Sequence, residues 1–138
     1  MSATVIHLQL KPMEGAPMKP VQSVTAIAGH GLQDDASAGH SKRQVLVIER
    51  ELLDEFQLPV GDVRENITVQ GIRLAGMAAG TWVYVGPVLL EATLDCAPCQ
   101  FIEDKRPGLR SAMEGKRGTL FKVIEGGEIH VGDGIRIA

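Results

Sequence analysis

Short apolar runs separated by glycine and proline place the strongest constraint on what this chain can fold into. Its 138 residues include 16 glycines and 7 prolines. Between them lie runs of Val, Ile, Leu and Thr about as long as single strands, which is the pattern of a β-rich domain with many turns. The predicted strands are Thr4 to Leu10, Val21 to Ala28, Gln44 to Ile48, Ile67 to Val69, Thr81 to Val85, Val88 to Thr93, Thr119 to Ile124 and Gly134 to Ile137. Their spacing predicts an all-β fold, a closed or nearly closed β-barrel with a few short helices.

Two short helices and one long loop complete the prediction. Residues 49–56 place apolar side chains at 52, 53 and 56 among charges, which is the spacing of one helical face, and Pro59 follows. A second helix is predicted after Pro98. The polar, glycine-rich stretch 29–40 is predicted to be a loop, and loops of that length are often functional. No repeat or linker divides the chain, so residues 1–138 are predicted to form a single domain.

Charge and hydropathy exclude several classes of function. The net charge is −3, which argues against general nucleic-acid binding but allows a local basic pocket. No apolar run approaches the ~20 residues of a membrane-spanning helix, and the N-terminus lacks the pattern of a secretion signal. The expected protein is soluble and cytoplasmic. Strand edges of so small a barrel can pair, so a homodimer is a plausible arrangement.

The only two cysteines, Cys96 and Cys99, lie in a C-x-x-C pattern. In a reducing compartment such a pair more often provides reactive thiols, metal ligands or redox partners than a structural bridge. Cys99 is the better candidate thiolate because Pro98 suits the opening of a helical turn and because basic residues follow. Those basic residues are Arg106, Arg110, Lys116 and Arg117. The alternative is that the thiols only fill the barrel wall, since free cysteine is commonly buried.

Zinc binding and thioredoxin-like exchange are competing interpretations of the cysteine pair. A structural zinc site needs four ligands. The chain offers one cysteine pair and four scattered histidines, so its sequence does not specify all four ligands of a zinc site. Thioredoxin-like exchange is expected beside a βαβ pattern with a parallel sheet, and no such pattern is predicted here.

Several polar residues at strand or loop boundaries are further candidates, among them the basic residues Arg43, Arg64, Arg73, Arg106, Arg110, Lys116 and Arg117. Arginine there can bind phosphate or carboxylate in a bidentate way, although a solvated surface charge is the simpler explanation of any single one. The segment 105–117 also contains glycines that free backbone amides to face an anion. Asn66 either orients a ligand or caps its turn. His40 could titrate near neutrality or bind a metal, but a lone histidine usually does neither.

Four segments occur in an order that resembles the MOSC domain, the C-terminal domain of molybdenum cofactor sulfurases, which also exists as small stand-alone bacterial proteins. They are Arg43-Gln44-Val45, the stretch Glu65-Asn66-Ile67-Thr68-Val69-Gln70-Gly71-Ile72, Ala97-Pro98-Cys99, and Arg117-Gly118 with Glu125 to Asp133. The resemblance implies a β-rich barrel and a role in molybdenum cofactor binding or sulfur transfer. The cysteine expected to carry the chemistry matches Cys99, as a molybdenum ligand or a persulfide bearer.

The resemblance also implies a ligand and partners. Arg43, Asn66 and Arg117 match positions near the family's presumed cofactor pocket. With Arg110 added, the arginines would bind the phosphate of the pterin cofactor, molybdopterin, and Asn66 would orient it. Cys96 is an extra thiol that could resolve a persulfide on Cys99 or form a disulfide with it.

These 138 residues include neither the N-terminal β-barrel domain of reductase relatives nor the pyridoxal-phosphate desulfurase domain of full sulfurases. A separate cysteine desulfurase or a molybdoenzyme is therefore the expected partner. The expected activity is that of a molybdenum-cofactor-dependent reductase or a sulfur transferase. One alternative is a non-catalytic module that carries the cofactor or a related phosphate ligand, and another is a structural domain with inert thiols.

Overall fold

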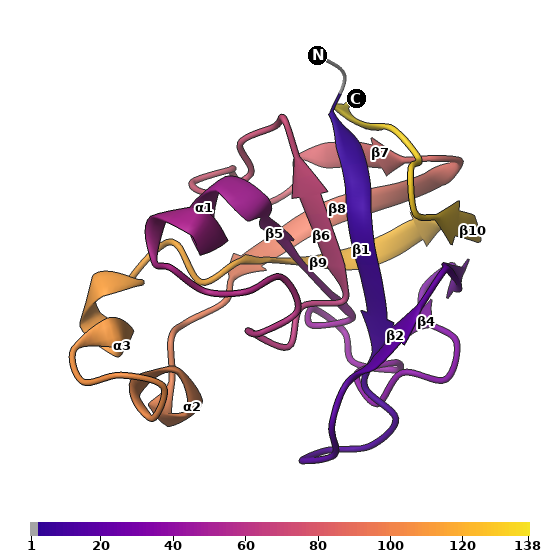
Figure 1. Ribbon diagram of the computed structural model, residues 1–138. Coiled ribbons are helices and arrows are strands. Elements are labelled where there is room, and N and C mark those ends of the chain that lie inside the picture. Colours follow the sequence, from indigo (N-terminus) through magenta and orange to yellow (C-terminus); the bar gives the residue numbers. More distant parts are fainter. Residues whose placement is uncertain (1–2) are drawn as a thin grey trace.

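Antiparallel strand pairing organises residues 3–138, the part of the chain that this computed structural model describes (Figure 1). The strands are β1 (Thr4–Leu10), β2 (Lys19–Val21), β3 (Ser23–Ile27), β4 (Gly31–Leu32), β5 (Val45–Glu49), β6 (Ile67–Gln70), β7 (Trp82–Val85), β8 (Val88–Asp95), β9 (Thr119–Glu125), β10 (Gly127–His130) and β11 (Ile135–Ile137). The helices are α1 (Arg50–Glu55), α2 (Gln100–Glu103) and α3 (Leu109–Ala112). The prediction of a mostly β fold with short helices is confirmed.

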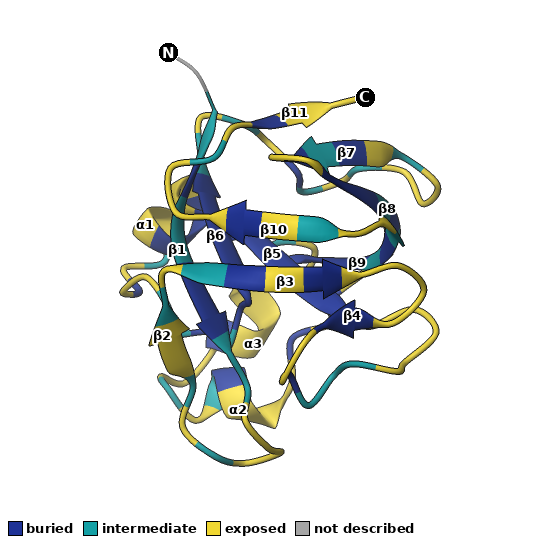
Figure 2. Cartoon of the chain, turned by 90° about the vertical axis from the view of Figure 1, so that its right-hand side faces the viewer, coloured by how far each residue is buried: buried dark blue, intermediate teal, exposed yellow. Residues whose placement is uncertain are grey.

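The prediction of a closed or nearly closed barrel is wrong, because neither sheet is closed. The larger sheet has the order β11-β7-β8-β9-β5-β6-β1-β2, and the smaller sheet has the order β10-β3-β4. To close a barrel, β11 would have to pair along the free edge of β1. Strand β2 occupies part of that edge. Gly134, the residue before β11, forms an isolated bridge with Thr4 of β1 instead of a ladder. The smaller sheet covers the open side, where β3 and β10 cross in front of the larger sheet (Figure 2).

Most predicted elements are found within one or two residues of their expected bounds, but one predicted strand is divided. The run Val21 to Ala28 contributes to two strands, because β2 pairs with β1 in the larger sheet and β3 pairs with β10 and β4 in the smaller one. The chain therefore changes sheets at Gln22. The loop predicted at 29–40 contains the short strand β4 and is otherwise made of turns and bends.

The parallel pair β5–β6 was not predicted. Val47 lies opposite Ile67, and α1 lies in the connection between the two strands. Both faces of β5 are buried: Val45 and Val47 belong to the main core, whereas Leu46 and Ile48 point to the other side. Alternation along a strand thus lets β5 contribute both to the core and to the opposite surface, where the candidate site lies.

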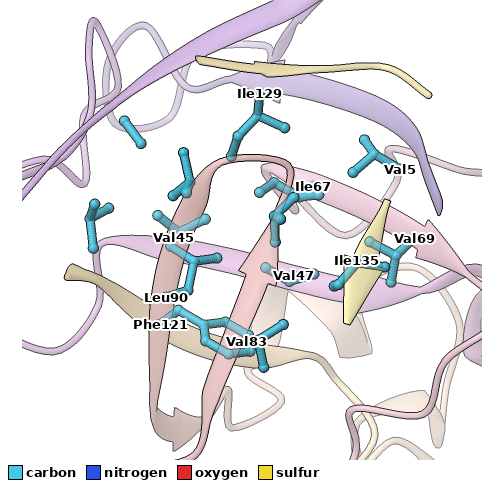
Figure 3. Packing of buried hydrophobic residues seen from close by; sticks show 14 of the residues in the cluster. Val5, Val45, Val47, Ile67, Val69, Val83, Leu90, Phe121, Ile129 and Ile135 are labelled. Carbon is cyan, nitrogen blue, oxygen red and sulfur yellow. The ribbon is translucent and has the colours of Figure 1, made fainter. Parts of the chain in front are cut away.

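The main core lies between the two sheets. Phe121 is fully buried there, and Ile129 of the smaller sheet packs toward strands of the larger one (Figure 3). A second cluster lies beneath the helices and consists of Ile48, Leu52, Leu53, Leu58, Val63, Ile102, Leu109 and Met113. A third, small cluster consists of Leu46, Cys96 and Leu120. Within residues 3–138, none of the helices has the length and apolar character needed to cross a membrane.

Candidate functional site

A cavity of about 300 Å³, here called the basic pocket, opens on the face of β5 opposite the main core. It is lined by Lys11, Glu14, Ser37, His40, Arg43, Leu46, Arg64, Asn66, Cys96, Arg117 and Leu120. These residues come from five regions of the chain: the loop after β1, the loop before β5 together with β5, the turn before β6, the segment after β8 and the residues around the start of β9. The pocket therefore exists only in the folded protein.

The apolar part of the lining is the third cluster. Leu46, Cys96 and Leu120 pack together and all face the cavity. The Cys96 amide donates to the carbonyl oxygen of Gly118 at 2.9 Å, which continues the β8–β9 pairing and places Cys96 beside the segment that carries Arg117. One side of the pocket is thus shielded from water by packed side chains.

Arg117 is the most unusual residue of the lining. It is 5% exposed, and its Nε and Nη1 atoms are buried without a hydrogen-bond partner. The next residue, Gly118, has φ +123°, and a Cβ there would lie 2.9 Å from Leu46 Cδ1. The positive φ angle favours glycine here, since a residue with a side chain would be strained at that angle. A buried guanidinium without a partner is costly, and a bound anion would offset that cost.

Arg64 is the second unusual residue. It lies in the left-handed region with φ +62°, and its Nη2 atom is buried without a partner. The neighbouring Glu65 is fully buried and accepts hydrogen bonds from Gly61 N at 2.8 Å, Val63 N at 3.2 Å and Thr68 Oγ1 at 2.7 Å. Strained backbone of this kind persists where the surrounding structure over-determines it, and it clusters at functional sites.

Asn66 lines the pocket, but its amide group is engaged with protein atoms. Its Oδ1 accepts from Leu46 N at 3.0 Å, and its Nδ2 donates to Asp35 Oδ1 at 3.0 Å and Gln9 O at 3.3 Å. Asp35 also accepts from Lys11 N at 2.7 Å and Ser37 N at 3.0 Å. In this arrangement Asn66 holds together the strands and the loop that frame the pocket.

The pocket carries a local excess of positive charge although the whole chain is acidic. Its basic lining residues are Lys11, His40, Arg43, Arg64 and Arg117, and its carboxylate is that of Glu14. Glu14 is 75% exposed and pairs with Lys11 at 3.4 Å. None of the ion pairs formed within residues 3–138 includes one of the pocket's three arginines. Such a cluster of unpaired guanidinium groups suits a phosphate-like anion.

The structure brings together three of the five predicted site residues. Arg43, Asn66 and Arg117 line the basic pocket, whereas Cys99 and Arg110 do not. Arg110 is exposed on α3. Its backbone amide donates to Glu103 Oε1 at 3.1 Å. Arg64 was one of the arginines at strand or loop boundaries that the sequence offered for anion binding, but it was not among the residues predicted for the cofactor pocket. Its backbone strain cannot be read from sequence.

The two cysteines occupy different environments, and both are free. Cys96 is buried in the pocket lining, whereas Cys99 is exposed and precedes α2. Burial alternates from Cys96 to Cys99. In extended chain this pattern turns the two side chains toward opposite sides. Among residues 3–138, no cluster of three or more His, Cys, Asp or Glu side chains is placed to hold a metal ion.

A carboxylate organises the helical segment that follows Cys99. Glu103 accepts hydrogen bonds from Gly108 N at 2.9 Å and Arg110 N at 3.1 Å. These two backbone donors hold the pKa of Glu103 below its ordinary value, because they stabilise the ionised form. The connection between α2 and α3 is thereby tied to an ionised side chain.

Comparisons with known proteins identify a family and similar folds. A model of the MOSC domain family matches residues 29–136. The structure is similar to that of the YuaD protein from Bacillus subtilis, with a TM-score of 0.77 at 18% identity, over 98% of this chain and 94% of that one. YiiM from Geobacillus stearothermophilus gives a TM-score of 0.77 at 17% identity, over 99% and 75% of the two chains. YiiM from Escherichia coli gives 0.74 at 18% identity, over 100% and 70%. No curated protein matches the sequence.

Proposed function

This chain belongs to the MOSC domain family, and from that membership and the basic pocket we propose that it binds the molybdenum cofactor by its phosphate and presents Cys99 as the reactive thiol. Membership of the family associates the chain with molybdenum cofactor chemistry in general terms. The residues, the ligand group and the role of the thiol are our inference.

The observation that carries the proposal is the unpartnered guanidinium of Arg117. A phosphate oxygen in the pocket would accept from the donors that Arg117 and Arg64 leave unused, and charge-assisted bonds of this type are the stronger class of hydrogen bond. Arg43 lines the same pocket and is exposed, so it would contact the anion from the entrance.

When bound, the cofactor would supply redox chemistry at molybdenum. The chain's own residues would bind and orient its phosphate end. Leu46 and Leu120 would exclude water from one side of that end, which strengthens its interactions with the arginines. Asn66, held by its bonds to Leu46 and Asp35, would keep the framework of the pocket in place.

The exposure of Cys99 supports a role in sulfur transfer. Its thiolate would attack the terminal sulfur of a persulfide on a donor protein. The new S–S bond would form on Cys99 as the donor's S–S bond breaks, and the donor would leave as a thiolate. The reaction moves one sulfur atom and needs no further oxidant or reductant. A buried thiol such as Cys96 could not meet a protein donor in this way.

A non-catalytic carrier of the cofactor is the second candidate function. It is favoured by one observation: Cys99 does not line the basic pocket, so phosphate binding and thiol chemistry are separable in this structure. A carrier would need the arginines but not Cys99.

The test is the molybdenum and pterin content of protein purified from a host that makes the cofactor. The variants are Arg117→Ala, Cys99→Ser and Cys96→Ser, with Arg73→Ala as control because Arg73 is an exposed arginine outside the basic pocket. We expect cofactor in the wild type and in Arg73→Ala, and its loss in Arg117→Ala. Loss in Cys99→Ser supports a metal-ligand role. Retention there fits both sulfur transfer and a carrier, and an added sulfur on Cys99 of the wild type, found by intact mass and absent from Cys99→Ser, favours sulfur transfer over the carrier. Equal content in Arg117→Ala and wild type would refute the proposed pocket.

A further inference from the structure

A second cavity lies beside α1, and its lining residues differ from those of the basic pocket. This cavity, of about 320 Å³, is lined by Glu49, Glu51, Leu52, Glu55, Gly71, Ile72 and Arg73. These residues belong to the end of β5, to α1 and to the turn after β6, and α1 lies beside β6 (Figure 1). We call this cavity the acidic pocket, because three of its lining residues are glutamates.

Glu49, the last residue of β5, is the most unusual residue of the acidic pocket. It is 3% exposed. Its Oε2 accepts hydrogen bonds from Leu74 N at 2.6 Å and Ala75 N at 2.9 Å, whereas its Oε1 is buried without a partner. A buried carboxylate oxygen without a partner is costly. A bound cation with N–H groups would donate to that oxygen and offset the cost.

The charges around Glu49 leave an excess of negative charge in the acidic pocket. Glu55 forms an ion pair at 2.9 Å with a lysine outside the pocket. Glu51 accepts from Gly71 N at 2.9 Å. None of the ion pairs formed within residues 3–138 includes Glu49 or Glu51. Arg73 is the only basic residue of the lining, so one guanidinium faces two carboxylates that have no ion-pair partner.

The lining suits an organic cation and not a metal ion. Leu52 and Ile72 supply apolar surface beside the carboxylates. Such a surface can cover the hydrocarbon stem of an amine, as it covers the stems of long basic side chains in folded proteins. In the part of the chain that the structure describes, no three His, Cys, Asp or Glu side chains are grouped so as to hold a metal ion.

We propose that the acidic pocket binds a primary ammonium or a guanidinium group carried on an apolar stem. The N–H groups of the ligand donate to Glu49, and its charge is balanced by Glu49 and Glu51. A small amine and a lysine or arginine side chain of another protein share this chemistry. The inference is independent of the proposed function, because the basic pocket is lined by other residues.

The experiment is a ligand titration followed in the proton–nitrogen correlation spectrum of the protein. The readout is the amide signals of Gly71, Leu74 and Ala75, which donate to the two glutamates. The probes are pentylammonium, butylguanidinium, pentyltrimethylammonium and pentanol. We expect the first two to bind about tenfold or more tightly than the others, because pentyltrimethylammonium has the charge without an N–H donor and pentanol lacks the charge.

A lysine derivative with both backbone ends blocked distinguishes the two sources of the ligand. Tighter binding of this derivative than of pentylammonium would identify a side chain of a partner protein as the ligand. The reverse order would identify a small free amine. Either order supports the acidic pocket as a cation site.

Three variants test the roles of the carboxylates. Glu49→Gln keeps an oxygen for the Leu74 and Ala75 amides but puts an N–H₂ group in place of the unpartnered oxygen, so we expect about tenfold weaker binding of pentylammonium. Glu51→Gln, at an exposed position, should weaken binding by about threefold and is informative even if Glu49→Gln does not fold. Glu125→Gln is the matched control, because Glu125 is an exposed glutamate outside the acidic pocket. Thermal unfolding of each variant verifies folding.

Three results would overturn the inference. The first is unchanged affinity for pentylammonium in both Glu49→Gln and Glu51→Gln. The second is equal affinity for pentylammonium and pentyltrimethylammonium, because no N–H donor would then be needed. The third is the absence of any shift of the three amide signals with pentylammonium or butylguanidinium, both in the wild type and in Arg73→Ala, which removes the like charge from the lining.

Discussion

Arg64 and Glu65 are adjacent in the chain, but Arg64 lines the basic pocket whereas the Glu65 side chain is buried and bonds to its own turn. The Glu65 carboxylate is fully buried and accepts three hydrogen bonds, while Arg64 lies at φ +62° and lines the basic pocket. The Gly61 and Val63 amides that donate to Glu65 fix the backbone before Arg64, and the hydrogen bond that Asn66 accepts from Leu46 N fixes it after Arg64. The strain at Arg64 is therefore a consequence of its neighbours' bonds.

Two substitutions of Arg64 should show separately how its backbone strain affects stability and how its guanidinium affects phosphate binding. Left-handed backbone costs a residue with a side chain roughly 1–2 kcal/mol that glycine does not pay. We expect Arg64→Gly to be more stable than Arg64→Ala by about 1 kcal/mol, after allowance for the greater freedom of glycine in the unfolded chain. Both variants should lose affinity for phosphate. Urea unfolding and phosphate titration measure the two effects; equal stability of the variants would contradict the strain argument.

Replacing Arg117 should stabilise the ligand-free protein. Its buried, unpartnered guanidinium is unfavourable without an anion, and an apolar side chain of similar length avoids that cost. We expect Arg117→Met to raise the free energy of unfolding by about 1 kcal/mol in phosphate-free buffer. Phosphate should raise the melting temperature of the wild type but not of Arg117→Met. A less stable Arg117→Met in phosphate-free buffer would show that the guanidinium is satisfied without a ligand.

Asn66 should matter for stability more than its size suggests. Asn66→Ala would leave Leu46 N unpaired and would remove one of the two hydrogen bonds that Asp35 Oδ1 accepts. Buried groups left unpaired cost about 1–3 kcal/mol each. We expect a loss of roughly 2–4 kcal/mol by urea unfolding. Gln33→Ala, at an exposed position in the same loop region, is the control and should change stability little; a loss below about 1 kcal/mol in Asn66→Ala would contradict this framework role.

The connection between α2 and α3 should loosen in acid. Bonds from Gly108 N and Arg110 N lower the pKa of Glu103. A lowered pKa means that the stabilisation is complete above the ordinary Glu value of about 4.3 and is lost as the pH falls through the pKa of the folded state. We expect hydrogen exchange at the Gly108 and Arg110 amides, corrected for its intrinsic pH dependence, to lose protection on acidification. In Glu103→Gln, protection that still depended on pH over that range would contradict the assignment to Glu103.

The local sequence pattern predicted most of the secondary-structure elements and part of the candidate site. Alternating apolar residues predicted strands such as β1 with its observed bounds, because strand formation there depends on neighbours in sequence. The family pattern predicted Arg43, Asn66 and Arg117, which share one pocket. Whether Cys99 and Arg110 act as predicted stays a prediction, because neither lines that pocket.

Closure of the sheet could not be predicted from the same pattern. Strand count and spacing are compatible with a barrel, but closure depends on whether the last strand forms a ladder with the first. β11 is only three residues long, β2 takes part of the available edge of β1, and Gly132 and Asp133 of the turn before β11 bond to Val5 of that strand. These are competitions between segments distant in the sequence.

The sequence by itself determined which segments become strands, where the chain turns, and which family it belongs to, because these depend on residue types and order along the chain. Tertiary structure alone decided the environment of the site's arginines: it buries Arg117 without a partner and strains Arg64 at the edge of the same cavity. It also puts Cys96 inside the pocket and leaves Cys99 outside. The physical reason is that burial and ion pairing depend on what lies nearby in space, and five separate regions of the chain supply the surroundings of this pocket.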